Sequence, residues 1–138
     1  MIAALPKYSG SRLRQRASSP KLLALNNALI TATHGLEPSA VKDERWRGRL
    51  VESAVGAHLL RSGEVWYWRE RNQEVDFVVR SGRSVVALEV KSGERHEGLH
   101  GLAAFAAQFR GVRTFLVGSD GVPIEEFLSS EPARWLAI

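Results

Sequence analysis

The fold is decided by the stretch EVDFVVRSGRSVVALEVK, residues 74–91. Apolar and polar side chains alternate in both of its halves, which predicts two β-strands. One predicted face carries Val75, Phe77 and Val79 in the first strand and Val86, Leu88 and Val90 in the second. Ser81-Gly82-Arg83 supplies the turn, and glycine at the first of two central positions favours a type II′ hairpin.

The length of this turn sets which charged residues face each other. If Gly82 and Arg83 are the two central residues, Asp76 falls opposite Glu89, and Asp76, Glu89 and Lys91 share one face. A three-residue loop would instead put Leu88 opposite Asp76. Like charges directly opposite destabilise a strand pair unless something compensates them. A divalent cation would do so, because Mg²⁺ favours one or two carboxylates together with water and substrate phosphate.

The two-residue turn therefore predicts a site for Mg²⁺ or Mn²⁺ on Asp76 and Glu89, with Lys91 beside it to stabilise charge. The alternative is a pair of solvent-facing strand edges. In that case Glu74 and Lys91 form an ordinary cross-strand ion pair.

The clearest helix is predicted from about Asp43 to Arg61, with acidic residues at its start and Gly63 at its stop. Glu52 borders the apolar stripe of this helix. Gly48 and Gly56 lie four residues to either side of it, so the helix can approach a sheet closely there. We expect Glu52 to lie in the gap between them.

The remaining elements complete an α/β fold with a mixed sheet flanked by helices. Residues 1–20 are predicted to form an irregular lead-in, and residues 21–138 a single domain. Within that domain we expect one or two short strands over 21–33, strands over 64–69 and 114–117, and helices over 99–109 and 124–128. The 99–109 helix should turn Leu99, Leu102, Ala103, Ala106 and Phe109 inward.

Charge is uneven over the 138 residues, whose formal net charge is +4. Residues 1–50 hold nine Lys and Arg against three Asp and Glu, and their arginines are Arg12, Arg14, Arg16, Arg45, Arg47 and Arg49. A basic flank beside an acidic centre suits a phosphate backbone, whereas solvated arginines are the simpler interpretation. The absence of cysteine excludes a disulfide scaffold and suits a cytoplasmic location, and no apolar run is long enough to span a membrane.

Glu52, Asp76 and Glu89-Val90-Lys91 together resemble the PD-(D/E)XK nuclease superfamily. Three more particular runs, GRLVE over 48–52, WR over 68–69 and EVKSG over 89–93, resemble the uncharacterised C-terminal domain of bacterial and archaeal AAA-type ATPases. Ser19-Pro20-Lys21-Leu22-Leu23 is similar to that family's approach to the domain.

The resemblance implies a restriction-endonuclease-like fold and a nuclease acting on nucleic acid, with DNA as the expected substrate. It implies that Asp76 and Glu89 bind the metal, that Lys91 is the catalytic lysine, and that Glu52 assists the metal or orients the lysine. Arg69 matches a family arginine of unknown role, and together with Arg45, Arg47 and Arg49 it is expected to contact nucleic acid. The superfamily's proline before the aspartate is replaced by Val75. An ATPase module precedes the domain in full-length members, and we expect this chain to be the C-terminal part of such a protein. The alternative function is a non-catalytic domain that binds nucleic acid or a partner for an ATPase.

Other motifs receive simpler interpretations. His96-Glu97-Gly98-Leu99-His100 satisfies the H-E-x-x-H pattern of zinc peptidases, but its glycine disfavours the helix that the motif requires. Trp66 and Trp68 are expected in the core, with Tyr67 on the opposite face. His34 and His58 are expected to have ordinary surface or core roles, and Gln108 is expected to be solvated.

Overall fold

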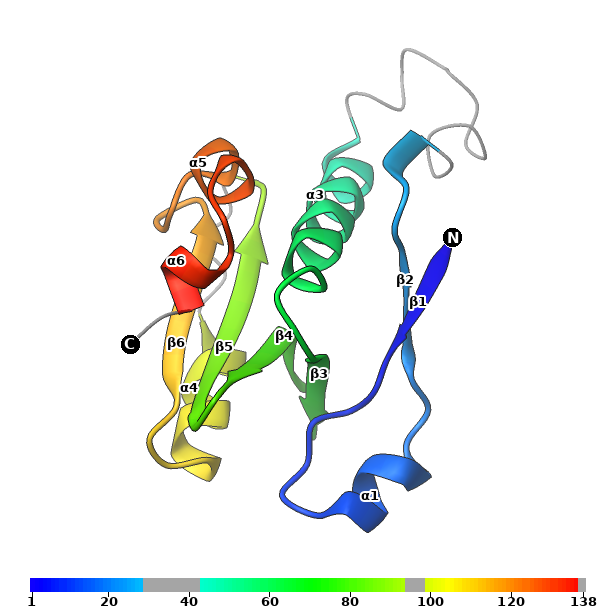
Figure 1. Cartoon of the computed structure of the whole chain (residues 1–138), viewed down its shortest axis with the longest axis vertical. Coiled ribbons are helices and arrows are strands. Elements are labelled where there is room, and N and C mark those ends of the chain that lie inside the picture. Colours follow the sequence, from blue (N-terminus) through cyan, green and yellow to red (C-terminus); the bar gives the residue numbers. More distant parts are fainter. Residues whose placement is uncertain (29–42, 94–98, 137–138) are drawn as a thin grey trace.

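The computed structural model describes residues 1–28, 43–93 and 99–136 (Figure 1). Its centre is a four-stranded sheet in the order β3-β4-β5-β6, formed by β3 (Val65–Glu70), β4 (Gln73–Ser81), β5 (Ser84–Lys91) and β6 (Arg113–Gly118). The first three strands are antiparallel neighbours, whereas β6 runs parallel to β5. Parallel strands need a crossover connection, and α4 (His100–Gln108) lies in it. The predicted mixed sheet is confirmed.

The hairpin between β4 and β5 has the two-residue turn predicted from the sequence. Ser81 pairs with Ser84, and the register continues to the pair Phe77 and Leu88. Gly82 adopts a φ of +61°, which an L side chain rarely adopts, and this explains why glycine stands at the first central position. The alternative three-residue loop is thereby excluded.

Helix α3 (Glu44–Leu59) follows the prediction closely. The side chain of Asp43 accepts hydrogen bonds from the backbone N–H groups of Arg45 and Trp46, which caps the helix. Gly56 faces the sheet, and a Cβ atom there would overlap the ring of Phe77 and the side chain of Leu23. The close approach of this helix to the sheet is therefore confirmed.

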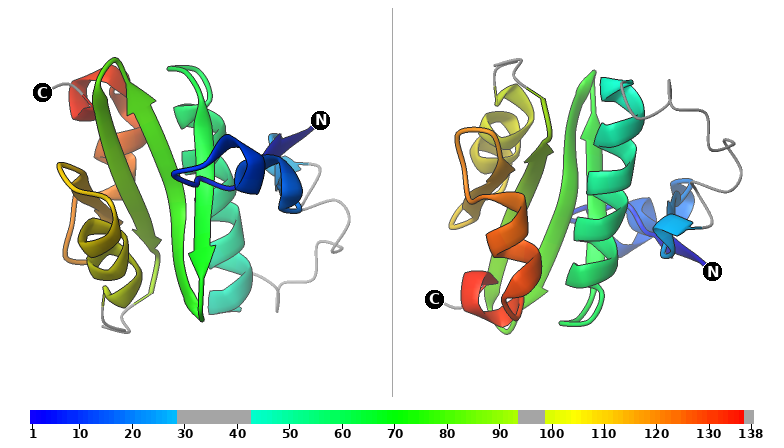
Figure 2. Two further views of the ribbon diagram at one scale, coloured as in Figure 1. Left: turned by 90° about the horizontal axis from the view of Figure 1, so that it is seen from below. Right: turned by 90° about the horizontal axis from the view of Figure 1, so that it is seen from above.

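Each face of the sheet is covered by a separate part of the core (Figure 2). One face packs against α3, α5 (Ile124–Ser129) and α6 (Ala133–Leu136), through residues such as Val55, Phe127 and Leu136. The opposite face packs against α4 through Leu102 and Phe105. Trp66 and Trp68 lie in the second cluster and Tyr67 in the first, as predicted.

The N-terminal residues are more ordered than the sequence predicts. In place of an irregular lead-in, β1 (Ile2–Leu5) pairs with β2 (Lys21–Ala24), and α1 (Arg12–Ala17) lies between them. The chain between β1 and α1 then covers the edge of β3, where Tyr67 N donates to Pro6 O and Tyr8 N donates to Tyr67 O. Such tertiary contacts override the Ser- and Gly-rich composition of this segment.

Several finer predictions need correction or fall outside the described residues. In α4, Leu102 and Phe105 are buried, whereas Leu99 is 42% exposed and Ala103 is also exposed, because the helix turns a different side to the sheet. His58 is buried, and its Nε2 lies 2.8 Å from the carbonyl oxygen of Ser130, which is a core role. His34, His96 and Glu97 lie outside the described residues. Within the described part of the chain, no helix is both long and apolar enough to cross a membrane.

Candidate functional site

The candidate site lies where α3, β2 and the adjoining ends of β4 and β5 meet. Glu52 comes from the middle of α3, Asp76 from β4, and Glu89 and Lys91 from the end of β5. Contacts with one further residue, Lys21 at the start of β2, join Glu52 and Asp76.

A β-bulge in β4 sets the position of Asp76. Trp66 pairs with Val78 and Trp68 pairs with Val75, so Asp76 and Phe77 together oppose Tyr67. The bulge reverses the alternation, and Val75 packs with the α4 cluster while Phe77 packs with the α3 cluster. The prediction that Val75, Phe77 and Val79 share a face is therefore wrong for Val75, because a strand with an extra residue does not keep the period of two.

The bulge also changes how Asp76 meets β5. The paired residues of β4 and β5 end at Phe77 and Leu88, one step before the predicted pair of Asp76 and Glu89. Instead, a carboxylate oxygen of Asp76 accepts a hydrogen bond of 2.9 Å from the backbone N–H of Val90. Asp76 is thus fixed to β5 through its side chain, next to the Glu89 and Lys91 positions.

Lys21 is the central cation of this cluster. Its Nζ lies 2.5 Å from Glu52 Oε1, 3.4 Å from Glu74 Oε1 and 4.0 Å from Asp76 Oδ1. Burial lowers the pKa of Lys21, but the negative charges of Glu52, Asp76 and Glu74 outweigh it and raise the pKa above its ordinary value. Lys21 therefore remains charged and links strand β2 to helix α3.

Asp76 has the most perturbed carboxyl group of the site. Burial raises its pKa, the charges of Glu52 and Glu89 raise it further, and the hydrogen bond from Val90 opposes them, with a resulting pKa of about 7. The positive charges near Asp76 are too few to compensate its ionised carboxylate. The site would accept a proton or an additional cation there.

Glu89 and Lys91 form the second part of the cluster. Lys91 Nζ lies 3.1 Å from Glu89 Oε1. The other carboxylate oxygen of Glu89, Oε2, is buried and has no hydrogen-bond partner. Burial raises the pKa of Glu89 above its ordinary value, although Lys91 opposes this effect. Oε2 of Glu89 can therefore bind a ligand without breaking a hydrogen bond.

Arg69 completes the cluster from the neighbouring strand. Its guanidinium donates two hydrogen bonds to Glu74 Oε2, at 3.2 and 2.8 Å. The ion pair that Arg69 forms with Glu74 takes the place of the alternative cross-strand pair between Glu74 and Lys91. Arg69 is 64% exposed, so it also reaches solvent beside the site.

The charges of the cluster favour one more cation. Its four carboxylates belong to Glu52, Glu74, Asp76 and Glu89, and its three cationic groups to Lys21, Arg69 and Lys91. Among the described residues, no group of three or more His, Cys, Asp or Glu is arranged to hold a metal ion. Mg²⁺ needs fewer, because one or two carboxylates with waters suffice. Asp76 and the unpartnered oxygen of Glu89 therefore fit such an ion by their chemistry.

Of the arginines predicted to contact nucleic acid, Arg69 lies in the cluster, where it pairs with Glu74. Arg45, Arg47 and Arg49 are exposed on the first turns of α3, and Arg12, Arg14 and Arg16 belong to α1. Of the six, Arg14 lines a pocket together with Gln108, which is exposed as predicted.

Sequence reasoning did not include Lys21 and Glu74 among the site residues. Lys21 lies 31 positions from Glu52 and 53 from Glu74 in the chain, so no local spacing connects them. The signal in the sequence is the Pro20-Lys21 pair, which belongs to the segment that resembles the family's approach to this domain. A lysine at the start of a short strand beside this acidic motif could have been assigned to the site.

The fold and the cluster define an α/β domain with a buried acidic centre at the end of its sheet. A comparison with family models matches residues 47–126 to "Domain of unknown function (DUF4143)", a domain commonly found in AAA-ATPase-associated proteins. The match spans more than half of the chain, and the chain belongs to this family. It includes Glu52, Asp76, Glu89 and Lys91, and it confirms the ATPase-associated part of the resemblance. No curated protein and no solved structure matches the chain.

Proposed function

We propose that this domain hydrolyses phosphodiester bonds of nucleic acid at the acidic cluster, with Mg²⁺ or Mn²⁺ held by Asp76 and Glu89. The observation that carries the proposal is that these two carboxylates are largely buried and lack sufficient compensating positive charge. They are mostly buried, with 17% and 15% of their side chains exposed, and burial raises the pKa of both, with the charge of Glu89 adding to the shift of Asp76. One oxygen of Glu89 has no hydrogen-bond partner. A divalent cation would compensate both groups.

When bound, the metal would polarise the phosphate and lower the pKa of a water molecule. The residues of the chain have the remaining tasks. Lys91 is held 3.1 Å from Glu89 and would stabilise the negative charge that develops on the phosphate oxygens. Glu52 would keep Lys21 in place, and Lys21 in turn would limit the repulsion among the carboxylates.

A cleavage assay tests this proposal. The full chain is incubated with labelled single-stranded and duplex DNA and RNA, in Mg²⁺, in Mn²⁺ and in EDTA. We expect cleavage only with metal, and its loss in Lys91→Ala and in Asp76→Asn. Arg83→Ala, which removes an exposed cation at the far end of the same hairpin, should retain the activity. If the wild-type chain cleaves none of these substrates with either metal, the proposal is wrong.

A second function is favoured by Lys21. This side chain already pairs with Glu52, Glu74 and Asp76, so much of the acidic charge is neutralised without a metal. A domain of this kind would serve an attached or neighbouring ATPase by binding a partner or nucleic acid, without catalysis. Under this function the cluster stabilises the fold, and Mg²⁺ would not change the unfolding temperature.

A further inference from the structure

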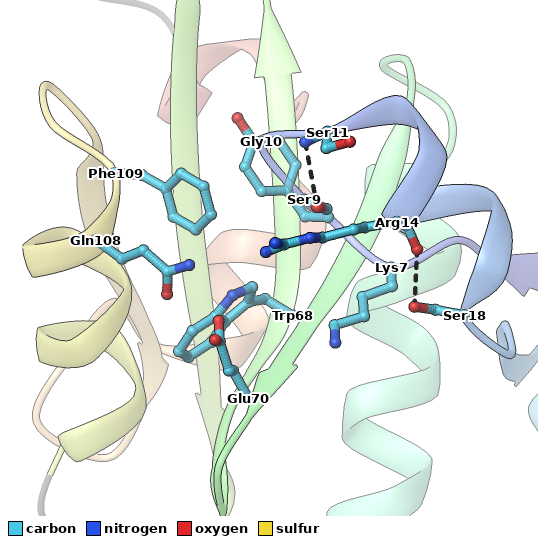
Figure 3. Close-up of a pocket in the computed structure, with 11 residues that line it drawn as sticks. Lys7, Ser9, Gly10, Ser11, Arg14, Ser18, Trp68, Glu70, Gln108 and Phe109 are labelled. Carbon is cyan, nitrogen blue, oxygen red and sulfur yellow. Dashed lines mark hydrogen bonds between the residues drawn. The ribbon is translucent and has the colours of Figure 1, made fainter.

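A pocket of about 480 Å³ lies between the N-terminal segment and α4, on the opposite side of β3 from the contact between Arg69 and Glu74. The polar groups that line it include Lys7, Arg14 and Gln108, and its apolar wall is formed by Trp68 and Phe109. Figure 3 shows the side chains of Arg14, Gln108 and Phe109 directed toward a common space. A volume of this size is typical of a small-ligand site.

The cations of the pocket are available to a ligand. No ion pair of Lys7 or Arg14 is found among the described residues, whereas Arg69 and Lys91 are paired in the neighbouring cluster. Arg14 reaches the pocket from α1, and Lys7 comes from the segment that is bonded to the edge of β3. An arginine fork and an ammonium that line one pocket from two elements suit a phosphate group.

The apolar wall gives the ligand a second property. Phe109 is partly exposed, and its ring is held by Tyr8 at 5.1 Å and by Phe105 at 4.6 Å between centroids. A ring fixed by two others offers a rigid surface on which a planar group can stack at little cost in entropy. Unpaired bases stack on aromatic side chains in this way, whereas the bases of a duplex are already stacked on each other.

We propose that this pocket binds one nucleotide unit of single-stranded nucleic acid, with its phosphate between Lys7 and Arg14 and its base against Phe109. The inference rests on the proposed function for the identity of the substrate. Trp68 and Glu70 line the pocket, and Arg69 between them contacts Glu74 of the acidic cluster. A strand bound in the pocket would therefore pass the end of β3 toward the carboxylates.

Among the described residues that line the pocket, Glu70 is the one acidic side chain, and it is exposed. Its charge opposes a phosphate, so Glu70→Gln should tighten binding. Two cations against one carboxylate still leave the pocket positive.

The experiment measures binding of a labelled single-stranded oligonucleotide to the full chain by fluorescence anisotropy, in EDTA and at low salt. Arg14→Ala is compared with Arg16→Ala, a matched control in the same helix, because Arg16 lines the adjoining pocket on the other side of the N-terminal segment. Both variants lose one positive charge and should fold normally, since both side chains are exposed. We expect Arg14→Ala to weaken binding at least tenfold and Arg16→Ala to weaken it less than threefold. Phe109→Leu should weaken binding severalfold, and a duplex of equal length should bind less tightly than the single strand.

Equal losses in Arg14→Ala and Arg16→Ala would overturn the inference, because general attraction to a basic surface would then explain binding. Failure of the wild-type chain to bind the single strand, or tighter binding of the duplex, would overturn it as well. These outcomes differ from a failure of the proposed function. Binding that depends on Arg14, without cleavage, would support the nucleotide pocket and overturn the proposed nuclease activity. Cleavage together with unchanged affinity in Arg14→Ala would support the nuclease activity and overturn the nucleotide pocket.

Discussion

The ammonium of Lys21 lies 2.5 Å from the carboxylate of Glu52, although the two residues are 31 positions apart in the chain. The contact joins the N-terminal strand pair to helix α3, and both side chains are about three-quarters buried. The contact is therefore part of the candidate site, and it also stabilises the domain.

Replacing Lys21 with methionine should destabilise the metal-free domain by about 1–3 kcal/mol, because it leaves the carboxylates of Glu52, Glu74 and Asp76 without their shared cation. Methionine keeps the apolar stem. Urea unfolding in EDTA measures the loss. As a control, Arg61→Ala removes an exposed pair with Glu131 and should cost less than about 1 kcal/mol. Equal effects of the two substitutions would show that Lys21 forms only a surface ion pair.

Asp76→Asn should stabilise the domain in EDTA at pH 8 by about 1 kcal/mol, since it removes one of several neighbouring negative charges. The amide oxygen can still accept the hydrogen bond from Val90. Mg²⁺ should raise the unfolding temperature of the wild type through binding to the folded state, and it should raise that of Lys91→Ala similarly. Asp76→Asn should lose most of this gain. Glu131→Gln, which changes an exposed carboxylate, should respond to Mg²⁺ as the wild type does. Destabilisation by Asp76→Asn in EDTA, with no metal response in the wild type, would favour the non-catalytic function.

The stability of the metal-free domain should fall as the pH rises from about 5 to 8. In the unfolded chain the pKa of Asp76 is near 4, whereas in the folded domain it is about 7. Between these values the folded state binds more protons than the unfolded state, so the free energy of unfolding decreases with pH. The raised pKa of Glu89 acts in the same direction. The advantage of Asp76→Asn over the wild type should grow across this range in urea titrations, and an advantage that stays constant would contradict the assignment.

Two glycines of α3 should respond oppositely to alanine. At Gly56 a Cβ atom would overlap the ring of Phe77 and the side chain of Leu23, so Gly56→Ala should destabilise the domain by about 1–3 kcal/mol. At Gly48 the nearest atom is Ser92 Oγ, 3.3 Å away on a small side chain. There the gain in helix propensity should stabilise the domain by up to about 1 kcal/mol. Thermal unfolding of both variants checks this, and the same sign for both would contradict the packing of α3 on the sheet.

The central strands could be predicted because their information is local. The turn at Gly82, the alternation of β5 and the capped helix α3 each depend on residues within a few positions of one another. The mixed sheet and its flanking helices followed from these elements.

The parts that could not be predicted depend on contacts between distant residues. Nothing in the alternation of β4 marks the bulge at Asp76, because the pattern reads equally well as a regular strand. The N-terminal strand β1 pairs with β2, about twenty positions further along the chain, and Lys7 pairs with Tyr67 at the edge of β3. An apolar stripe in the sequence predicted which side of α4 faces the sheet. In the structure the side with Phe105 faces the sheet, because its ring packs against Trp68 and Tyr8.

The extra residue in β4 means that Asp76 could be removed without removing any paired residue of the strand. Removal of Asp76 would let the ladder between β3 and β4 run without interruption, while the turn at Gly82 and the paired residues up to Phe77 keep their register. If the proposed hydrolysis takes place at this cluster, deletion of the Asp76 codon would abolish it and leave the scaffold in place. The number of residues between the positions of Val75 and Val78 would then distinguish family members that have the carboxylate of the bulge from members that have only the scaffold.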